Sequence, residues 1–281
     1  MTHRNASRPA RAPAVLPVLF LALLLAASVP GSDAVAAGLR RIDEAWLLPA
    51  AMAAEAIGGD VRPTASGAWV RFGHAQLFGV ASLPAHSAAI GARHHGMACE
   101  AGWDALGGDA FRDDCGRLRV RAGRSVALGI EASLRRVRPG PGSALTRADL
   151  DLTVGWQGAA GRLGTCDLRV AVPVAAGGAG ALAREPHRRL EIALGGRQCA
   201  VAMAWGAGPD GSPSASWEAL CGLGDGLGML WRADGASGAV GGGFVWQRGP
   251  FRLRTSHLAH PDLGLTHRLE VALGKVQVSP W

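Results

Sequence analysis

The sequence predicts an all-β fold: an antiparallel transmembrane β-barrel of about 14 strands (range roughly 12–16), preceded by a short N-terminal helical segment. Three observations lead to this prediction. Apolar and polar residues alternate with a period of two through most of the chain after residue 60. Glycine is abundant, at 41 of 281 residues, which disfavours long helices and suits turns and closely packed strands. Tryptophans recur near the ends of the predicted strands.

The first 36 residues are predicted to be a cleaved signal peptide. Arginines at positions 4, 8 and 11 precede an apolar run at residues 14–27, and residues 34–36 (Ala-Val-Ala) form a small-residue cleavage pattern. This run is short for a helix that spans a bilayer, although an uncleaved anchor remains the alternative. Cleavage and export would place the mature chain in an oxidising compartment.

Residues 37–60 are predicted to be a helical segment that stands apart from the strands. Residues 42–46 and 50–57 have helical character, Pro49 is suited to a first helical turn, and Gly58-Gly59 would end the helix. Two placements remain open, a cap packed on one end of the barrel and a plug inside its lumen. Residues 61–281 would form the barrel as one domain, because no Pro-rich or Ser-rich linker divides them.

From residue 66 onward, predicted strands follow one another closely. In residues 126–137, for example, Leu128 and Ile130 share one face while Glu131 lies on the other. The last stretch, residues 238–281, predicts three successive strands that end in a terminal aromatic residue. About fifteen candidate strands can be counted, and at ~10 residues per spanning strand the chain holds roughly 12 to 14.

The placement of tryptophan favours lipid as the partner of the apolar face. Rings near strand ends suit the two aromatic girdles of a membrane barrel, whereas a soluble core would hold them nearer strand centres. The predicted membrane-interface aromatics are Trp156, Trp205, Trp217, Trp231 and Trp246.

The opposite face of the predicted strands carries charges of both signs. Inside a barrel such charges can pair across neighbouring strands, whereas the alternative is the solvated face of a soluble sheet. The residues predicted to face the lumen are Arg117, Arg119, Glu131, Asp151, Asp167, Arg169, Glu191, Arg252, Arg254, Arg268 and Glu270.

Four short segments resemble a known family. Residues 249–253 (Gly-Pro-Phe-Arg-Leu) and 260–269 (His-Pro-Asp-Leu-Gly-Leu-Thr-His-Arg-Leu) are similar to the closing motif of the PorV/PorQ and UPF0164 group of outer-membrane barrels, which are FadL-like in shape. Residues 108–113 and 49–53 are similar to two other elements of that group. The resemblance implies an outer-membrane barrel of about 14 strands, some of whose relatives anchor or shuttle secreted proteins.

Nothing in the sequence indicates a nucleic-acid partner, a cofactor, a metal site or an enzyme. The net charge of +7 includes three signal-peptide arginines, and no basic run is interleaved with aromatics. His94 and His95 are adjacent, so in a strand they would point to opposite faces, which does not suit one metal ion. No nucleophile elbow and no phosphate-binding glycine loop is present. Cys99 and Cys115 flank the loop at Gly107 and are a candidate disulfide pair.

These features together predict an outer-membrane protein. It would act as a channel for small or hydrophobic compounds, or as an envelope anchor or shuttle for secreted proteins. Its expected partners are outer-membrane lipid and either a secreted protein or a hydrophobic small molecule. The alternative is an exported soluble β-sandwich or barrel that binds a ligand or an envelope partner.

Overall fold

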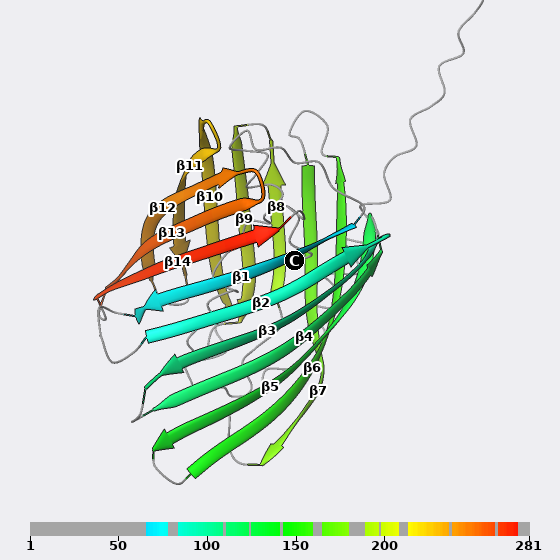
Figure 1. Ribbon diagram of the computed structural model, residues 1–281, viewed down its shortest axis with the longest axis vertical. Coiled ribbons are helices and arrows are strands. Elements are labelled where there is room, and N and C mark those ends of the chain that lie inside the picture. Colours follow the sequence, from blue (N-terminus) through cyan, green and yellow to red (C-terminus); the bar gives the residue numbers. More distant parts are fainter. Residues whose placement is uncertain are drawn as a thin grey trace, which may run out of the picture. The chain divides into compact units, whose positions relative to one another are not determined.

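The computed structural model describes residues 66–77, 84–108, 111–123, 125–140, 143–159, 165–179, 189–196, 198–207, 213–235, 238–261 and 264–274. These residues form strands with short connections between them (Figure 1). The strands are β1 (Ser66–Gln76), β2 (Pro84–His94), β3 (Met97–Gly107), β4 (Arg112–Gly123), β5 (Val126–Gly140), β6 (Ser143–Ala159), β7 (Thr165–Ala179), β8 (Arg189–Gly195), β9 (Cys199–Ala207), β10 (Pro213–Gly224), β11 (Leu227–Asp234), β12 (Ala239–Arg248), β13 (Phe251–His260) and β14 (Gly264–Gly274).

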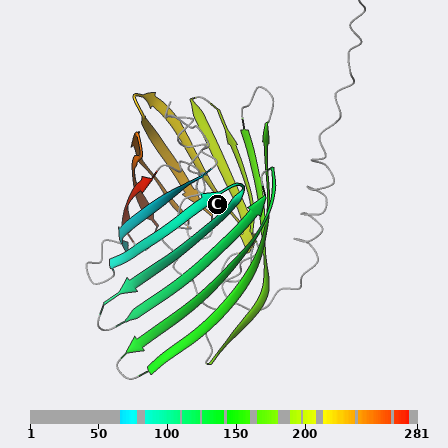
Figure 2. The same ribbon diagram turned by 45° about the vertical axis from the view of Figure 1, so that its right-hand side comes forward.

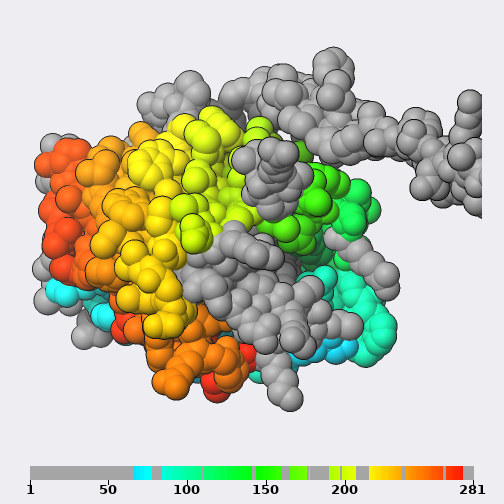
Figure 3. Space-filling model, turned by 90° about the horizontal axis from the view of Figure 1, so that it is seen from above, coloured from blue at the N-terminus to red at the C-terminus, as the bar shows by residue number. Residues whose placement is uncertain are grey.

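The strands form one closed antiparallel barrel. Each strand pairs with its neighbours in the chain, and β1 pairs with β14 from Trp69 opposite Gly274 to Gln76 opposite His267. An end-on view shows the colours following the chain around the ring (Figure 3). The predicted fold class is therefore confirmed, including the number of strands.

The barrel wall differs in height around its circumference. The longest strand, β6, has 17 residues, whereas β8 has 7. The strands from β1 to β7 lie side by side in chain order as long tilted ribbons (Figures 1 and 2). The fourteen strands compare with about fifteen candidates in the sequence, and β1 is continuous from Ser66 to Gln76.

The two ends of the barrel carry different connections. At one end lie the start of β1, the end of β14 and tight turns such as the one between β10 and β11, where Asp225 and Gly226 have φ of 51° and 76°. Both values lie in the left-handed region that two-residue hairpin turns of this kind require. The strand ends that longer connections join, such as Gln76 with Pro84 and Ala179 with Arg189, lie at the other end. We call these the short-turn end and the long-loop end.

The two faces of the wall follow from the register. Pairing places Glu100, Arg119 and Glu131 on one face, where side chains are buried or half-buried. The opposite face includes Leu128, 58% exposed, and Leu134, 57% exposed. We call these the inner and the outer face. Most large apolar residues of the wall thus lie outward and most charged residues lie inward, the reverse of a soluble protein.

Several predicted features lie outside the described residues. These are the signal peptide at residues 1–36, the helical segment at residues 37–60 and the terminal Trp281. Among the residues that the structure does describe, no helix is long and apolar enough to cross a membrane.

Candidate functional site: the barrel interior

A network of buried charges crosses the inner face from β1 to β5. Glu100 on β3 accepts hydrogen bonds from Trp69 Nε1 at 3.1 Å, from Arg71 Nη2 at 2.9 Å and from Arg119 Nη1 at 3.5 Å. Arg119 also donates from Nε to Glu131 Oε2 at 2.7 Å. Glu100 is only 3% exposed, so its charge is compensated by neighbouring strands rather than by water. The network joins four strands at one level of the wall.

More ion pairs surround this network on the same side of the barrel. Arg117 on β4 pairs with Asp104 on β3, one strand away. Along β6, Arg147 Nε donates to Asp149 Oδ1 at 2.8 Å, between residues two apart that share a face. These pairs fix arginine side chains against the wall, because a planar guanidinium held by a carboxylate loses most of its rotational freedom.

Similar ion pairs lie on β7 and β8. Arg169 Nε donates to Asp167 Oδ1 at 2.8 Å on the same strand, and its Nη1 lies 3.8 Å from Glu191 Oε2 on β8. Opposite Glu131, the register places Asp151 of β6. Asp151 is buried, so two carboxylates stand side by side on this part of the inner face.

A second charge cluster lies on the strands that close the barrel. Glu218 on β10 is fully buried, at 3.6 Å from Arg232 Nη1 and 3.9 Å from Arg254 Nη2. Arg252 Nη2 lies 3.5 Å from Glu270 Oε1 across β13 and β14. Because opposite charges attract strongly where water is excluded, these arginines and carboxylates stabilise one another.

The structure places all of the residues that the sequence analysis assigned to the lumen on the inner face, and it brings most of them together in pairs. Arg119 with Glu131, Arg169 with Asp167 and Glu191, and Arg252 with Glu270 are such pairs. Arg268 lies on β14 opposite Ser256 and Ala75. That these side chains line an open path through the barrel stays a prediction.

Sequence reasoning missed several members of the interior. Trp69, Arg71, Glu100 and Asp104 are as central to the network as any predicted residue. The spacing of Trp69 and Arg71, and of Glu100 and Asp104, was the available signal, since residues two or four apart share a face of a strand. Ala101 and Gly102, between Glu100 and Asp104, obscured the alternation there.

The inner face is not charged all the way round. On β8 to β12 it presents an apolar patch made by Ala193, Ala200, Ala202, Ala204, Leu220, Leu230 and Val245. Leu220, Leu230 and Val245 have no exposed surface. β9 contributes only the alanines Ala200, Ala202 and Ala204 to this patch. The interior therefore has a charged region and an apolar region, and β10 and β11 contribute side chains to both.

The outer face carries an apolar belt that includes exposed tryptophans. Trp103, Trp205, Trp217 and Trp231 are each about two-fifths exposed on β3, β9, β10 and β11. Near the short-turn end, Trp246 packs edge to face on Phe251 with ring centroids 5.6 Å apart. Trp156 also lies toward that end of its strand. That the predicted interface rings lie at the two membrane interfaces stays a prediction.

Two histidine pairs lie on the outer face toward the long-loop end. His257 and His267 face each other across β13 and β14 with Nδ1 atoms 2.7 Å apart. His74 and His86 do the same across β1 and β2 at 3.4 Å. Exposed imidazoles are poorly suited to the hydrocarbon core, so these pairs are expected to lie at its boundary.

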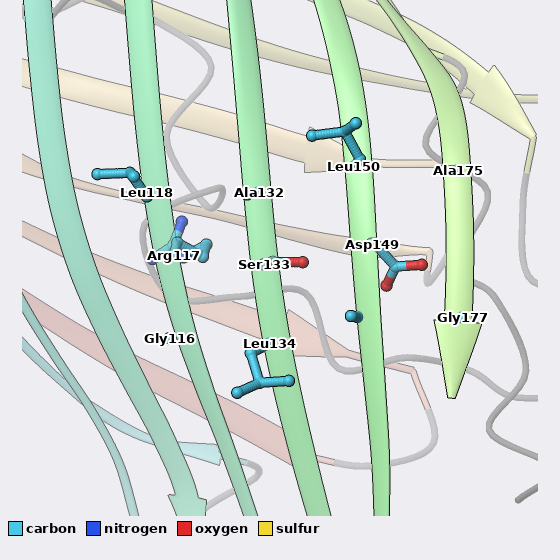
Figure 4. Close-up of a pocket in the computed structure, with 11 residues that line it drawn as sticks. Gly116, Arg117, Leu118, Ala132, Ser133, Leu134, Asp149, Leu150, Ala175 and Gly177 are labelled. Atoms are coloured by element: carbon cyan, nitrogen blue, oxygen red, sulfur yellow. The ribbon is translucent and has the colours of Figure 1, made fainter. Parts of the chain in front are cut away.

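A shallow groove interrupts the apolar belt over β4 to β7 (Figure 4). Its volume is about 600 Å³, and small outward residues such as Gly116, Ala132 and Gly177 form its floor. Leu118, Leu134 and Leu150 project around it. Arg117, Ser133 and Asp149, which belong to the inner face, also line it.

The histidines and cysteines singled out in the sequence form no metal site in the part of the chain that is described, where no group of three or more His, Cys, Asp or Glu could hold an ion. His94 Nε2 and His95 Nδ1 are 2.6 Å apart at the turn after β2. The candidate disulfide between Cys99 and Cys115 is excluded by the register. Cys99 lies opposite Val120 on the outer face, whereas Cys115 lies opposite Asp104 on the inner face.

Comparison with known proteins gives fold likeness only. No protein-family model matches the chain, and no curated protein matches it. Among solved structures, CdiB from Acinetobacter baumannii is similar with a TM-score of 0.41 and 8% identity over 75% of this chain. The chain spans 60% of the length of CdiB. A mutant of the Rh. blastica porin is similar with a TM-score of 0.39 and 10% identity, covering 74% of this chain and 99% of the porin. Similarity at this level does not bear on function.

Proposed function

We propose that this chain is an outer-membrane β-barrel of the PorV/PorQ-like type, exported through a cleaved signal peptide. It would serve as a channel for small or hydrophobic compounds or as an envelope anchor or shuttle for secreted proteins. The proposal assigns it no catalytic activity. Its membrane partner is outer-membrane lipid.

One observation carries this proposal: the apolar residues of a closed barrel point outward while the charges point inward. Large hydrophobic side chains between 37% and 64% exposed occur on β1 to β7 and on β8 to β14 alike. Monomeric soluble proteins rarely expose apolar patches above a few hundred Å². A bilayer removes that surface from water, and a closed barrel leaves no unpaired strand edge within it. The soluble alternative accounts for neither the belt nor the buried charges.

The channel function is supported by an interior that has both charged and apolar regions. Charged pairs over β1 to β8 can steer an ionic solute, while the apolar patch on β8 to β12 suits a hydrophobic one. The anchor branch is supported by the resemblance at residues 249–253 and 260–269, which concerns the strands that close the barrel.

Fractionation tests the membrane assignment. The protein should sediment with outer membranes, resist extraction by carbonate and migrate faster on gels when unheated, because a closed hydrogen-bonded barrel resists detergent denaturation. Recovery in the soluble periplasmic fraction, with the same mobility before and after heating, would refute the proposal.

Planar-bilayer recording separates the two branches. Residues 37–281 and residues 61–281 should be purified in parallel and inserted into the same bilayers. Conductance steps from both forms indicate an open channel, and steps only from the shorter form indicate that residues 37–60 act as a plug. If neither form conducts, the channel branch fails, and affinity capture from the native envelope then tests for a secreted protein partner.

A further inference from the structure

Two of the five cysteines face each other directly on neighbouring strands. Cys199 begins β9 and lies opposite Cys221 on β10, with the two Sγ atoms 3.3 Å apart. Cys199 is exposed and Cys221 is half-buried. Both lie on the outer face, since Cys221 alternates with inward Leu220 and Cys199 with inward Ala200.

The local hydrogen bonding is favourable for a covalent bridge. Gly222 N donates to Gln198 O at 2.7 Å, which makes those two residues a hydrogen-bonded pair. The adjoining pair, Cys221 with Cys199, is therefore a non-hydrogen-bonded one, in which Cα atoms approach to ~4.5 Å. Disulfides span Cα separations of about 4.4–6.8 Å, so the backbone need not move for the bond to form.

We propose that Cys199 and Cys221 form a cross-strand disulfide in the mature protein. A metal ion is a poorer explanation of the pair, because no third His, Cys, Asp or Glu joins it among the described residues. This inference rests on the proposed export, since disulfides persist in oxidising compartments.

The reaction is a thiol–disulfide exchange. Both S–H bonds break and one S–S bond forms, and the two protons and two electrons reduce the disulfide of a periplasmic oxidoreductase to a dithiol. The pair lies toward the short-turn end, together with the start of β1 and the end of β14. In barrels of bacterial outer membranes, short turns face the periplasm, so this end lies on the side of the oxidant.

The bridge would secure a register that side chains specify weakly. On its inner face β9 carries only alanines, Ala200, Ala202 and Ala204, against β10. Small uniform side chains distinguish poorly between neighbouring registers, because a slip changes few contacts. A covalent link at the first residue of β9 fixes the alignment of the whole hairpin.

The thiol state of the protein from outer membranes tests the proposal. Cells are quenched in acid, and the chain is denatured and alkylated with iodoacetamide without reductant. Trypsin cuts after Arg197 and Arg232, so both cysteines fall on one peptide, residues 198–232. That peptide should be lighter than its reduced form by two hydrogen atoms and carry no alkyl group. Cleavage before Asp210 should leave its two parts linked until reductant is added.

Three cysteines provide internal controls. Cys99, Cys115 and Cys166 have no facing cysteine in the register and should be alkylated fully in the same sample. Cys199→Ser should convert Cys221 to a fully alkylated residue, whereas Cys166→Ser should leave the bridge intact. Full alkylation of Cys199 and Cys221 in the wild-type protein from membranes would overturn the proposal, whether or not any variant folds.

The test also separates this inference from the proposed function. A protein that fractionates with outer membranes but carries five free thiols refutes the disulfide alone. A protein recovered in the soluble fraction refutes the membrane assignment, and incubation of the purified wild type with oxidised glutathione then decides the disulfide. Closure of the Cys199–Cys221 bond as the main product supports it, and mixed glutathione adducts at both thiols refute it.

Discussion

Glu100 provides the most direct test of the interior network. Its carboxylate is 3% exposed and accepts hydrogen bonds from Trp69, Arg71 and Arg119. Glu100→Ala removes all three bonds and leaves two arginines beside a vacated site. Breaking a buried ion pair by deleting one partner typically costs about 3–5 kcal/mol. Glu100→Gln keeps the shape and one acceptor oxygen, so its expected cost is smaller, at about 1–3 kcal/mol.

The measurement is the free energy of unfolding in urea of protein folded into lipid vesicles, followed by the gel mobility of unheated samples. Asp114 supplies the matched control, because it pairs with Arg112 and Arg138, whose side chains are 45% and 43% exposed. Asp114→Asn should cost less than about 1 kcal/mol. If Glu100→Ala costs no more than Asp114→Asn, the carboxylate is not a buried centre of the network and the reasoning fails.

Two further substitutions test the faces of the wall, and both are read as the change in free energy of unfolding in the same assay. Leu134→Arg places a charge on the outer face near the middle of β5 and should destabilise the protein in lipid by about 2–4 kcal/mol; a soluble barrel would show little change at a side chain that is 57% exposed. Gly243→Val should cost about 1–3 kcal/mol through overpacking, because a Cβ at that position would lie 1.9 Å from the backbone oxygen of Thr255. Gly116→Leu is the matched control, since nothing lies within 4 Å of its added Cβ, and an equal cost for both glycine variants would contradict the close approach of β12 and β13.

The positions of the strands were largely predictable from the sequence, because the alternation of apolar and polar residues within each strand indicates its two faces. The run at residues 126–137 became β5, and its apolar residues Leu128 and Ile130 lie outward as the alternation requires. Residues 238–274 became β12, β13 and β14. Inward residues were missed where glycine and alanine dilute the pattern, as around Glu100 and Asp104.

The cysteines show the limit of local reasoning. Spacing in the sequence favoured a disulfide between Cys99 and Cys115, but the register places these two residues on opposite faces of the wall. The pair that does meet, Cys199 with Cys221, is separated by a full hairpin, and only the alignment of β9 with β10 brings it together. A difference of one residue in that register would place the two thiols on opposite faces.

The sequence by itself determined the class of fold, the approximate number of strands and which side chains share a face, because a period of two is a local property of the extended backbone. Only the tertiary structure decided the closure of β14 on β1, the partners of each buried charge and the one-sided apolar patch inside. Those features depend on register between strands, and register is set by the summed contacts of whole strands around a closed ring, which no single stretch of sequence contains.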